Sequence, residues 1–374
     1  MSKIKVLHVF QQMSRGGAET MIMNIYRKID REKIQFDFLC MSPQKGDYDE
    51  EIKKLGGNIY IIPSPKERGP INHIKDIVKV IKEHGGYDAI HIPTMFHSGI
   101  VCFAAYIAHV KKRIVHSHNA NEFNDNTLKR KIYRGISRVL IKLFCTDRVA
   151  CGIKAREYLF GKSKKVEKNT LLVNNGIELE EYKNINKDML EEKINELGLS
   201  KTELIIGNVA RFEEQKNHVF FLKLAHYLKD KNINAKIVLV GDGKLREEIQ
   251  NRTIQEEIDK YFVFTGKRKD IPYIMSIFDV FVMPSLYEGF PLTIVEALAA
   301  GKNCVISDTI SIEVEVIDGT ISFVNLNDRI EKWYDLIINA KQKRTDKLSN
   351  IKKLEELGYS AKSSMESLVR LYMK

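Results

Sequence analysis

Two glutamates with seven residues between them, Glu288 and Glu296, form the spacing in this chain that most clearly suggests chemistry. They lie in the stretch 284–308, which follows a short apolar run typical of a buried strand. Pro291 suits the first turn of a helix and Gly301 its left-handed C-cap, which puts Glu288 in a loop and Glu296 in the helix. Open α/β sheets bind anionic ligands where a strand's carboxyl end leads through a loop into a helix N-terminus. The stretch therefore predicts a ligand site, first of all for an anion.

Arg211 and Lys216, five positions apart, follow the first apolar run of the second half of the chain. At the carboxyl end of a strand, an arginine fork and a lysine point charge can converge on a diphosphate. The alternative is two unrelated surface cations, but their position at a strand end favours the diphosphate. The turns 241–243 and 265–267 end the next two strands, and they either shape a nucleotide pocket or simply reverse the chain.

The first strand-to-helix turn contains the adjacent glycines Gly16 and Gly17. Glycines let the backbone approach a ligand closely, and the following helix offers free N–H groups to a phosphate. The turn lacks the GxGxxG pattern of a dinucleotide fold, so it could equally serve packing alone. His118 ends a later strand, where it could donate to a substrate hydroxyl or be a satisfied structural histidine. His116 completes an HxH pair, but no third ligand is close in sequence, so we expect no metal.

The segment 126–144 has the clearest helical pattern in the chain. Its apolar positions share one face: Leu128, Ile132, Ile136, Val139, Leu140 and Leu143. Its main cations repeat every four residues: Arg130, Arg134, Arg138 and Lys142. A basic helix suits contact with anionic lipid, where each surface cation contributes about 1 kcal/mol. A solvated face on a packed helix explains the pattern equally well.

Short apolar runs alternate with helical segments from end to end, as in parallel sheets that are covered on both faces. We expect strands at 5–10, 35–39, 58–62, 87–92, 112–116, 147–151, 171–173, 204–209, 236–240, 261–265, 280–283, 304–306 and 321–324. Predicted helices include 18–29, 72–83, 126–144, 217–229, 244–250, 271–277, 293–300 and 361–373.

The expected architecture is two doubly wound, Rossmann-like α/β domains that face a cleft. The first covers 1–176 and the second 201–355, and the polar, charged stretch 177–200 is interpreted as a linker between them. The last segment, 356–374, is helical.

Charge is distributed unevenly along the chain, whose net charge is +11. Residues 1–180 hold 31 Lys and Arg against 19 Asp and Glu, which leaves 29 against 30 for the rest. The basic half suggests an anionic partner such as a membrane surface, a phosphorylated acceptor or nucleic acid, or else a lysine-rich background. The five scattered cysteines, the absence of a visible signal peptide and the lack of a bilayer-length apolar stretch favour a cytoplasmic protein.

In order along the chain, these motifs resemble the retaining glycosyltransferases of family 4, which have the GT-B fold. The E-x7-E element of Glu288 and Glu296 is the most specific match, and the resemblance covers nearly the whole chain. The chain is most similar to enzymes that assemble bacterial exopolysaccharide, capsule or related surface glycans. It departs from the family at 301–303, where relatives often carry G-x-P, and at 307–310, where they have a glycine-rich turn.

The resemblance implies a role for each motif. Arg211 and Lys216 would stabilise the leaving nucleoside diphosphate, Glu296 would hold the ribose hydroxyls, and Glu288 the hydroxyls of the donor sugar. Further implied donor contacts are Gly16, Gly17, His118, Lys267, Arg268, Gly289, Phe290, Pro291 and Leu292. The C-terminal helix would cross back onto the first domain.

The implied function is transfer of a hexose or N-acetylhexosamine from a nucleotide sugar, UDP-linked by expectation, to a lipid-linked or growing glycan acceptor. No cofactor, metal or nucleic acid is expected, and the place of action is the cytoplasm or the inner face of the membrane. A glycosidase acid/base pair is disfavoured, because nothing indicates that the two glutamates flank a scissile bond. A catalytically idle sugar-nucleotide-binding subunit and a GT-B epimerase or phosphorylase remain as alternatives. The sugar, the linkage and the oligomeric state are not predicted.

Overall fold

The computed structural model describes residues 3–118, 127–200 and 202–373. They form two compact units, the first made of Met1–Gly176 and Gly358–Lys374 and the second of Ile177–Leu357. Asn119, which follows the predicted histidine motif, and Asn126, at the predicted start of a helix, lie outside the described residues.

The first unit contains a parallel sheet of seven strands in the order β3-β2-β1-β4-β5-β6-β7. Its strands are β1 (Ile4–Phe10), β2 (Ile34–Cys40), β3 (Ile59–Ile61), β4 (Ala89–Ile92), β5 (Lys112–Ser117), β6 (Asp147–Ala150) and β7 (Thr170–Leu172). The strand order reverses between β1 and β4, which creates a topological switch point at their carboxyl ends.

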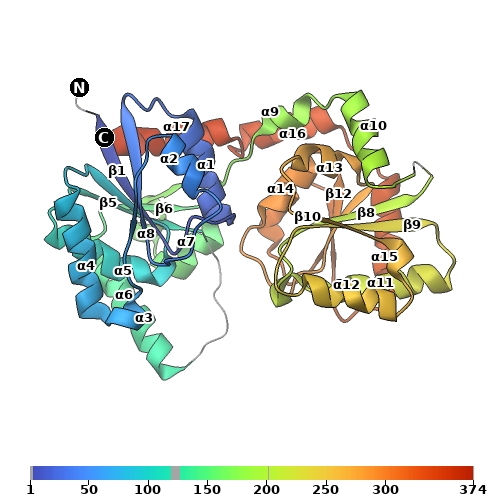
Figure 1. Ribbon diagram of the computed structural model, residues 1–374, viewed down its shortest axis with the longest axis horizontal. Helices are drawn as coiled ribbons and strands as arrows, with labels where there is room; N and C mark the ends of the chain where they lie inside the picture. Colours follow the sequence, from blue (N-terminus) through green and yellow to red (C-terminus); the bar gives the residue numbers. More distant parts are fainter. Residues whose placement is uncertain (1–2, 119–126, 201, 374) are drawn as a thin grey trace. The chain divides into compact units, whose positions relative to one another are not determined.

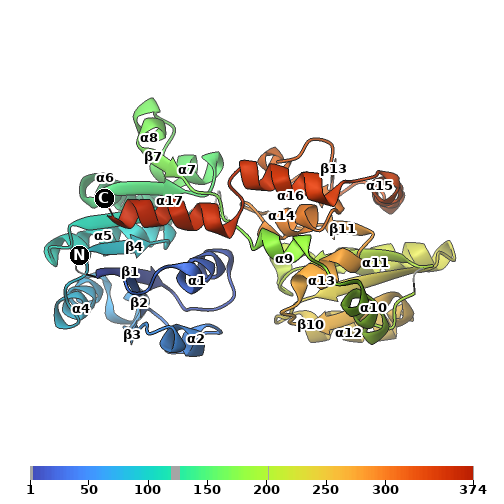
Figure 2. The same cartoon turned by 90° about the horizontal axis from the view of Figure 1, so that it is seen from above.

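Helices cover both faces of this sheet (Figure 1). They are α1 (Gly17–Lys28), α2 (Asp49–Lys54), α3 (Pro65–Arg68), α4 (Pro70–Glu83), η1 (Met95–His97), α5 (Ser98–Ile107), α6 (Leu128–Phe144), α7 (Ile153–Phe160), α8 (Lys164–Lys168) and α17 (Ala361–Met373). One core cluster joins the sheet to α1 and α17, and a second joins its other face to α4 and α5. The last helix, α17, lies along the strands of this unit (Figure 2), where Leu368, Leu371 and Tyr372 are buried.

The second unit contains a parallel sheet of six strands in the order β10-β9-β8-β11-β12-β13. Its strands are β8 (Leu204–Val209), β9 (Ala235–Val240), β10 (Phe262–Gly266), β11 (Val280–Met283), β12 (Asn303–Ser307) and β13 (Ile321–Val324). Its helices are α9 (Leu179–Lys183), α10 (Lys187–Glu196), η2 (Glu214–Lys216), α11 (Val219–Asp230), α12 (Arg246–Gln255), η3 (Asp259–Tyr261), α13 (Ile271–Ile277), α14 (Leu292–Ala299), η4 (Ile312–Val314), α15 (Ile330–Gln342) and α16 (Lys347–Glu356).

The predicted fold class is confirmed, and each of the thirteen predicted strands overlaps a strand of the structure. Gly301 has φ 74°, as expected for a left-handed residue after α14. The stretch interpreted as a linker forms α9 and α10, and both helices belong to the second unit.

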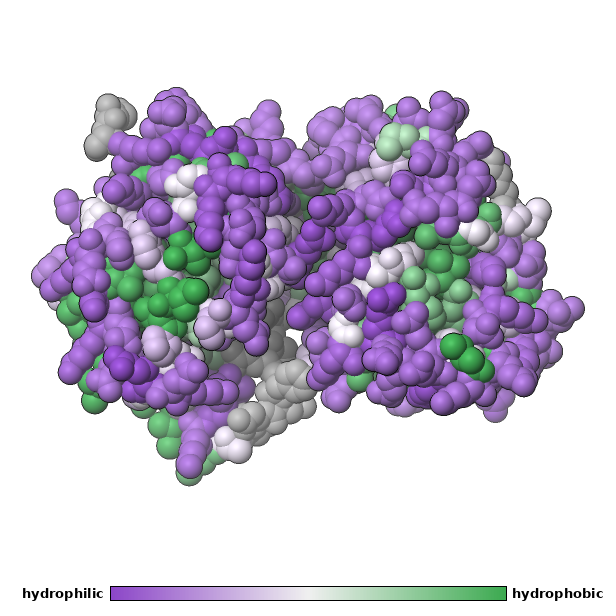
Figure 3. Space-filling view, viewed as in Figure 1, coloured by the Kyte–Doolittle hydropathy of each residue, from purple (hydrophilic) through white to green (hydrophobic). Residues whose placement is uncertain are grey.

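The outer surface of α6 differs from expectation. Its apolar residues reach solvent, with exposed fractions between 54% and 74%: Leu128, Ile132, Ile136, Val139 and Leu143. Two of its arginines instead turn back onto the unit, since Arg134 and Arg138 lie 5.7 and 5.2 Å from the centre of the buried Phe96 ring. Hydrophobic side chains reach the surface of this unit beside hydrophilic ones (Figure 3). The exposed surface of α6 therefore carries apolar residues beside exposed cations such as Arg138 and Lys142. An amphipathic pattern does not tell which face is buried.

Candidate donor site

The candidate site of the second unit lies at its own topological switch point. The strand order reverses between β8 and β11, which pair directly through Ile206–Val280 and Gly207–Phe281. The loop 210–218 follows the carboxyl end of β8, and the loop 284–291 follows that of β11. A side chain on Gly207 would collide with the ring of Phe278, so glycine allows the segment before β11 to pack closely against β8. Crevices of this kind bind ligands in doubly wound sheets.

Lys216 and Glu288 meet across these two loops. The Lys216 Nζ lies 2.5 Å from Oε1 of Glu288, and the two side chains are 17% and 7% exposed. The other carboxylate oxygen accepts a 3.3 Å hydrogen bond from the Gln215 amide, which also donates to the Tyr287 carbonyl. The predicted cation and the predicted carboxylate therefore form one pair, largely shielded from water.

Hydrogen bonds to the backbone hold the two loops together. The Leu286 N–H donates to the Gln215 carbonyl at 2.8 Å, and the Asn217 amide donates to the Pro284 carbonyl at 3.0 Å. Asn217 has φ 54°, a left-handed conformation that asparagine tolerates better than most residues. This turn lies directly beside Lys216, so the same contacts fix the position of the lysine.

Arg211 precedes the anchored part of its loop. Its guanidinium is exposed and has no hydrogen-bond or ion-pair partner within the described part of the chain. The next residue, Phe212, is fully buried and stacks on the buried His218 ring at 4.0 Å. Arg211 is thus attached to a rigid anchor while its charge stays available to an anion.

Glu296 lies on α14, in the second turn of that helix, and is only partly exposed. Burial raises the pKa of its carboxyl group from the ordinary 4.5 to about 7, and the nearby Glu181 carboxylate adds to the shift. Among the described residues, no side chain or backbone group donates a hydrogen bond to this carboxyl group. Its oxygens can therefore accept from a ligand.

The remaining predicted contacts of this stretch connect Glu288 to Glu296. Gly289 and Phe290 continue the loop, Pro291 is the N-cap residue of α14, and Leu292 begins the helix. The segment 307–310, which stands where the family has a glycine-rich turn, contacts the loop before α14. The Ser307 and Thr309 hydroxyls both donate to the Ser285 carbonyl, at 2.6 and 2.9 Å.

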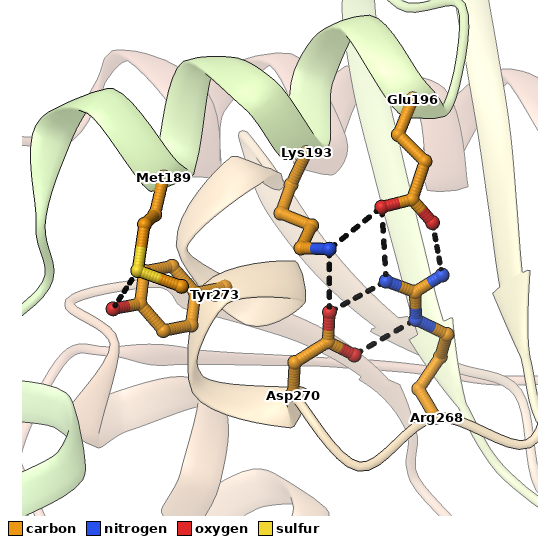
Figure 4. A network of polar contacts seen from close by, with 6 residues as sticks. All are labelled: Met189, Lys193, Glu196, Arg268, Asp270 and Tyr273. Carbon is orange, nitrogen blue, oxygen red and sulfur yellow. Dashed lines mark hydrogen bonds and ion pairs between the residues drawn. The ribbon is translucent and has the colours of Figure 1, made fainter.

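Arg268 is committed to a network of ion pairs (Figure 4). Its guanidinium lies 2.6 Å from Glu196 and 2.5 Å from Asp270, and Lys193 meets the same two carboxylates at 2.8 and 3.7 Å. The network connects α10 to the loop before α13, and it raises the pKa of Arg268. Its guanidinium is therefore already occupied by two carboxylates. Lys267, its neighbour, is exposed at the carboxyl end of β10.

The other predicted site residues lie in the first unit. Gly16 is the N-cap of α1 and Gly17 its first residue, at the carboxyl end of β1. His118 follows β5 and is 8% exposed, and burial lowers the pKa of its imidazole to about 4. All three residues thus lie at the carboxyl edge of the sheet.

Two family models match the chain. Residues 15–181 match "Glycosyltransferase Family 4", and residues 190–363 match "Glycosyl transferases group 1". EpsF of Bacillus subtilis (strain 168), which carries a glycosyltransferase name, is 40% identical over 372 residues, covering 99% of this chain and 97% of EpsF. The chain belongs to glycosyltransferase family 4.

Two further comparisons agree with this family 4 glycosyltransferase assignment. A protein of Escherichia coli named UDP-Gal:alpha-D-GlcNAc-diphosphoundecaprenol alpha-1,3-galactosyltransferase is 30% identical over 370 residues, covering 94% of this chain and 90% of that protein. The fold is that of Anabaena HepE in complex with UDP-glucose, with a TM-score of 0.78 at 18% identity, covering 99% of this chain and 100% of HepE. The fold of the glycosyltransferase is therefore GT-B.

Some site residues of the glycosyltransferase were not predicted. Gln215, Asn217, Ser307 and Thr309 all hold the loop of Glu288 through hydrogen bonds. Their common signal is a polar residue in the turn after a strand, next to a predicted ligand contact. That signal is too frequent in loops to single out these positions before the strand order is known.

The Glu296 carboxyl group of the glycosyltransferase should make its stability depend on pH. Between its ordinary pKa of 4.5 and its folded pKa of about 7, the folded state binds more protons than the unfolded state. The free energy of unfolding therefore falls as pH rises, by about 2 kcal/mol between pH 5 and pH 8. Glu296→Gln removes this contribution, so we expect the variant to gain stability relative to the natural protein as pH rises. Urea unfolding at a series of pH values measures the difference, and a difference independent of pH would contradict the assignment.

Within the described residues, no helix of the glycosyltransferase has both the length and the apolarity needed to cross a bilayer. Within the same residues, no group of three or more His, Cys, Asp or Glu side chains is arranged to hold a metal ion.

Proposed function

We propose that the chain is a retaining glycosyltransferase that moves a hexose or N-acetylhexosamine from a UDP-linked donor. The observation that carries the proposal is the shielded Lys216–Glu288 pair at the switch point of the second unit. A cation that can meet a phosphate and a carboxylate that can accept from sugar hydroxyls are held 2.5 Å apart there. The name of the Escherichia coli relative and the UDP-glucose bound to HepE support a UDP-sugar donor.

In the proposed reaction, the bond between the donor sugar's C1 and the diphosphate oxygen breaks, and its electron pair leaves with the diphosphate. Arg211 and Lys216 stabilise the negative charge that develops on the leaving group, as preorganised charges do in other enzymes. Glu288 orients the sugar hydroxyls and Glu296 the ribose hydroxyls. We also propose, from the family resemblance, that Gly16, Gly17, His118 and Lys267 contact the donor, and that the backbone of Gly289, Phe290, Pro291 and Leu292 does so too.

An acceptor hydroxyl then forms the new bond to C1, and its proton passes to the leaving diphosphate oxygen. We propose transfer to the same face of the sugar, since the site offers no evident protein nucleophile for a covalent intermediate. The cations are proposed to replace a metal ion in stabilising the diphosphate. Measuring the anomeric configuration of the first product by NMR tests retention, and inversion would contradict it.

The proposed acceptor is a lipid-linked or growing glycan of a bacterial surface polysaccharide. The printed name of the Escherichia coli relative specifies a diphosphoundecaprenol acceptor. A capsular polysaccharide biosynthesis glycosyltransferase of Staphylococcus aureus, CapH, is 28% identical over 310 residues, covering 81% of this chain and 80% of CapH. We propose that the enzyme acts in the cytoplasm, at the inner face of the membrane.

Calorimetric titration with UDP-, GDP- and ADP-linked sugars tests the donor class. We expect a UDP-sugar to bind, and to bind more weakly when Arg211 is replaced by alanine. If no nucleotide sugar binds at millimolar concentration, the proposed function is wrong.

We further propose that the exposed apolar stripe of α6 contacts the membrane. Leu128, Ile132, Ile136, Val139 and Leu143 define this stripe, and the exposed Lys129, Lys131 and Lys142 accompany it on the same helix. Apolar side chains can enter the interface while the cations stay at the level of anionic head groups. The membrane-contact role thus moves from Arg134 and Arg138 to the apolar stripe.

Replacing Ile132 and Ile136 by aspartate should lower the fraction of protein that sediments with phosphatidylglycerol vesicles. Each side chain is more than half exposed, so the fold should survive. Two lost insertions of about 1.5 kcal/mol each predict a partition that is weaker by about a hundredfold. The control replaces Ile254 and Leu348, which are 65% and 62% exposed in the second unit, and should leave sedimentation unchanged. Equal sedimentation of both double variants would remove the stripe from the proposal.

A further inference from the structure

Four buried histidines line one face of the sheet in the first unit. His8, His91 and His116 come from the adjacent strands β1, β4 and β5, and His118 follows β5. The first three are fully buried and His118 is 8% exposed. None of the three fully buried histidines has a place in the proposed reaction, and a buried imidazole with an unmet hydrogen bond is costly.

A hydrogen-bond chain connects two of these histidines to the C-terminal helix. The Tyr372 hydroxyl of α17 lies 2.5 Å from His91 Nδ1, and His91 Nε2 lies 3.1 Å from His116 Nδ1. The His91 and His116 rings are stacked with an interplanar angle of 10°. The hydrogen-bond chain therefore runs across the sheet from α17 to β5, inside a single compact unit.

The direction of the chain follows from counting protons. Burial, with other histidines nearby, holds the pKa values of His91 and His116 well below the ordinary value, so both rings are neutral. A neutral imidazole has one N–H and one acceptor nitrogen. If Tyr372 donates to His91, then His91 donates through Nε2 to His116, whose own proton is on Nε2.

The opposite direction is less favourable. It would leave the Tyr372 hydroxyl proton without an acceptor, because within the described residues this hydroxyl has no partner besides His91. With Tyr372 donating, only the Nε2–H of His116 lacks a partner among the described residues; in the opposite direction, both the Tyr372 O–H and the Nε2 lone pair of His116 lack one. Because each buried polar group without a partner costs about 1–3 kcal/mol, Tyr372 donates and both histidines carry their proton on Nε2.

The hydrogen-bond chain ends at His116, which packs against His118, the predicted site histidine. The His116 and His118 rings pack with their centroids 3.8 Å apart, at an interplanar angle of 36°. Within the described residues, neither His118 nitrogen has a partner at normal hydrogen-bond geometry, although the Asn175 side chain lies close enough to raise the pKa of the imidazole. Besides Asn175, packing on His116 restrains the His118 ring, and Tyr372 and His91 in turn fix the orientation of His116.

We propose that Tyr372, His91 and His116 are positioning residues that hold the His118 ring in place through a directed hydrogen-bond chain from α17. The inference rests on the proposed function, in which His118 contacts the donor sugar. The proposal gives Tyr372, in the last turn of α17, a positioning role at the carboxyl edge of the first unit's sheet.

The test is Tyr372→Phe, which removes one hydroxyl group and keeps the buried ring. In protein labelled with 15N-histidine, two-bond 1H–15N spectra report which nitrogen of each ring is protonated, and His118→Asn assigns the His118 signal. We expect the natural protein to show His91 and His116 protonated on Nε2 alone. In the variant we expect mixed tautomers for both, a shifted His118 signal, and a kcat lowered about tenfold with donor KM within twofold.

The matched control is Tyr26→Phe. Tyr26 is buried in the same core cluster, and its hydroxyl donates to the Leu55 carbonyl at 3.1 Å and accepts from the Gln35 amide, so it takes no part in the histidine hydrogen bonds. The Tyr26→Phe variant should lose stability as Tyr372→Phe does, but its histidine signals and kcat should stay unchanged. If kcat falls as much in this control as in Tyr372→Phe, the loss of kcat results from a less stable core, and the proposal is overturned.

Two results for Tyr372→Phe itself would also overturn the proposal: unchanged tautomers of His91 and His116, or altered tautomers with kcat at the natural level. If the natural protein turns over no nucleotide sugar, the proposed function fails and with it the positioning role in catalysis. The tautomer spectra, which need no donor, would then still show whether the directed chain exists. The two failures are therefore distinguishable.

Discussion

Replacing Lys216 by alanine should lower turnover about a hundredfold or more while the protein stays folded. The lysine is held in the turn between β8 and α11, and its ammonium group is one of two cations placed to meet the leaving diphosphate. Its charge acts most strongly when the sugar–oxygen bond is breaking, so we expect the loss mainly in kcat. Steady-state kinetics with the best UDP-sugar, together with a thermal unfolding curve, measure both quantities.

The matched control for this variant is Lys332→Ala. Lys332 also forms a 2.8 Å ion pair in the second unit, with Asp328, but its side chain is 59% exposed. A solvent-exposed pair contributes little, so turnover and stability should stay close to those of the natural protein. Near-normal turnover of Lys216→Ala would remove this lysine from the mechanism.

Glu288→Gln is expected to have the second large effect, also about a hundredfold. The substitution keeps the volume of the side chain but removes the charge that pairs with Lys216 and that is proposed to hold the sugar hydroxyls. A site built to bond a hydroxyl group loses both orientation and affinity when its acceptor is altered, so we expect kcat to fall and donor KM to rise. Glu256→Gln, which alters a carboxylate paired with Arg252 at 3.0 Å in the same unit, is the control.

The two variants should not be independent. Because Lys216 and Glu288 are in direct contact, removing one already disturbs the other, and the double variant should lose less than the product of the two single losses. Strictly multiplicative losses would contradict the view that the pair works as one unit. Full activity of Glu288→Gln would show that the carboxylate does not orient the donor.

Much of the fold could be predicted because buried parallel strands have a strong sequence signal. The bounds of Leu204–Val209, Val280–Met283 and Ile321–Val324 agree with the prediction at both ends, since a polar residue precedes each apolar run and Pro284 or Asn325 follows two of them. The positions of Glu288, Glu296 and Arg211 after strands or on the following helix could be predicted for the same reason. The helix α5 was harder to single out, because it is apolar on most sides and lacks a polar face.

The partners of these residues could not be predicted. Lys216 and Glu288 are 72 positions apart, and their contact depends on β8 lying beside β11, which no local pattern encodes. Arg268 meets Glu196 across another 72 positions, and that ion pair competes with its expected contact to the donor. The periodicity of α6 shows which residues share a face, but the packing of its arginines on Phe96 decides which face is exposed.

Transfer itself is the most direct test of the central claim. The protein is incubated with UDP-glucose, UDP-galactose and their N-acetylated forms, together with a pool of polyprenyl-diphosphate-linked glycans, and the products are read by mass spectrometry. We expect one donor to release UDP while an acceptor gains the mass of one hexose or N-acetylhexosamine, and we expect Lys216→Ala to abolish most of that gain. Donor binding without release of UDP or a mass gain on any acceptor would contradict the transferase account and favour a catalytically idle binding subunit.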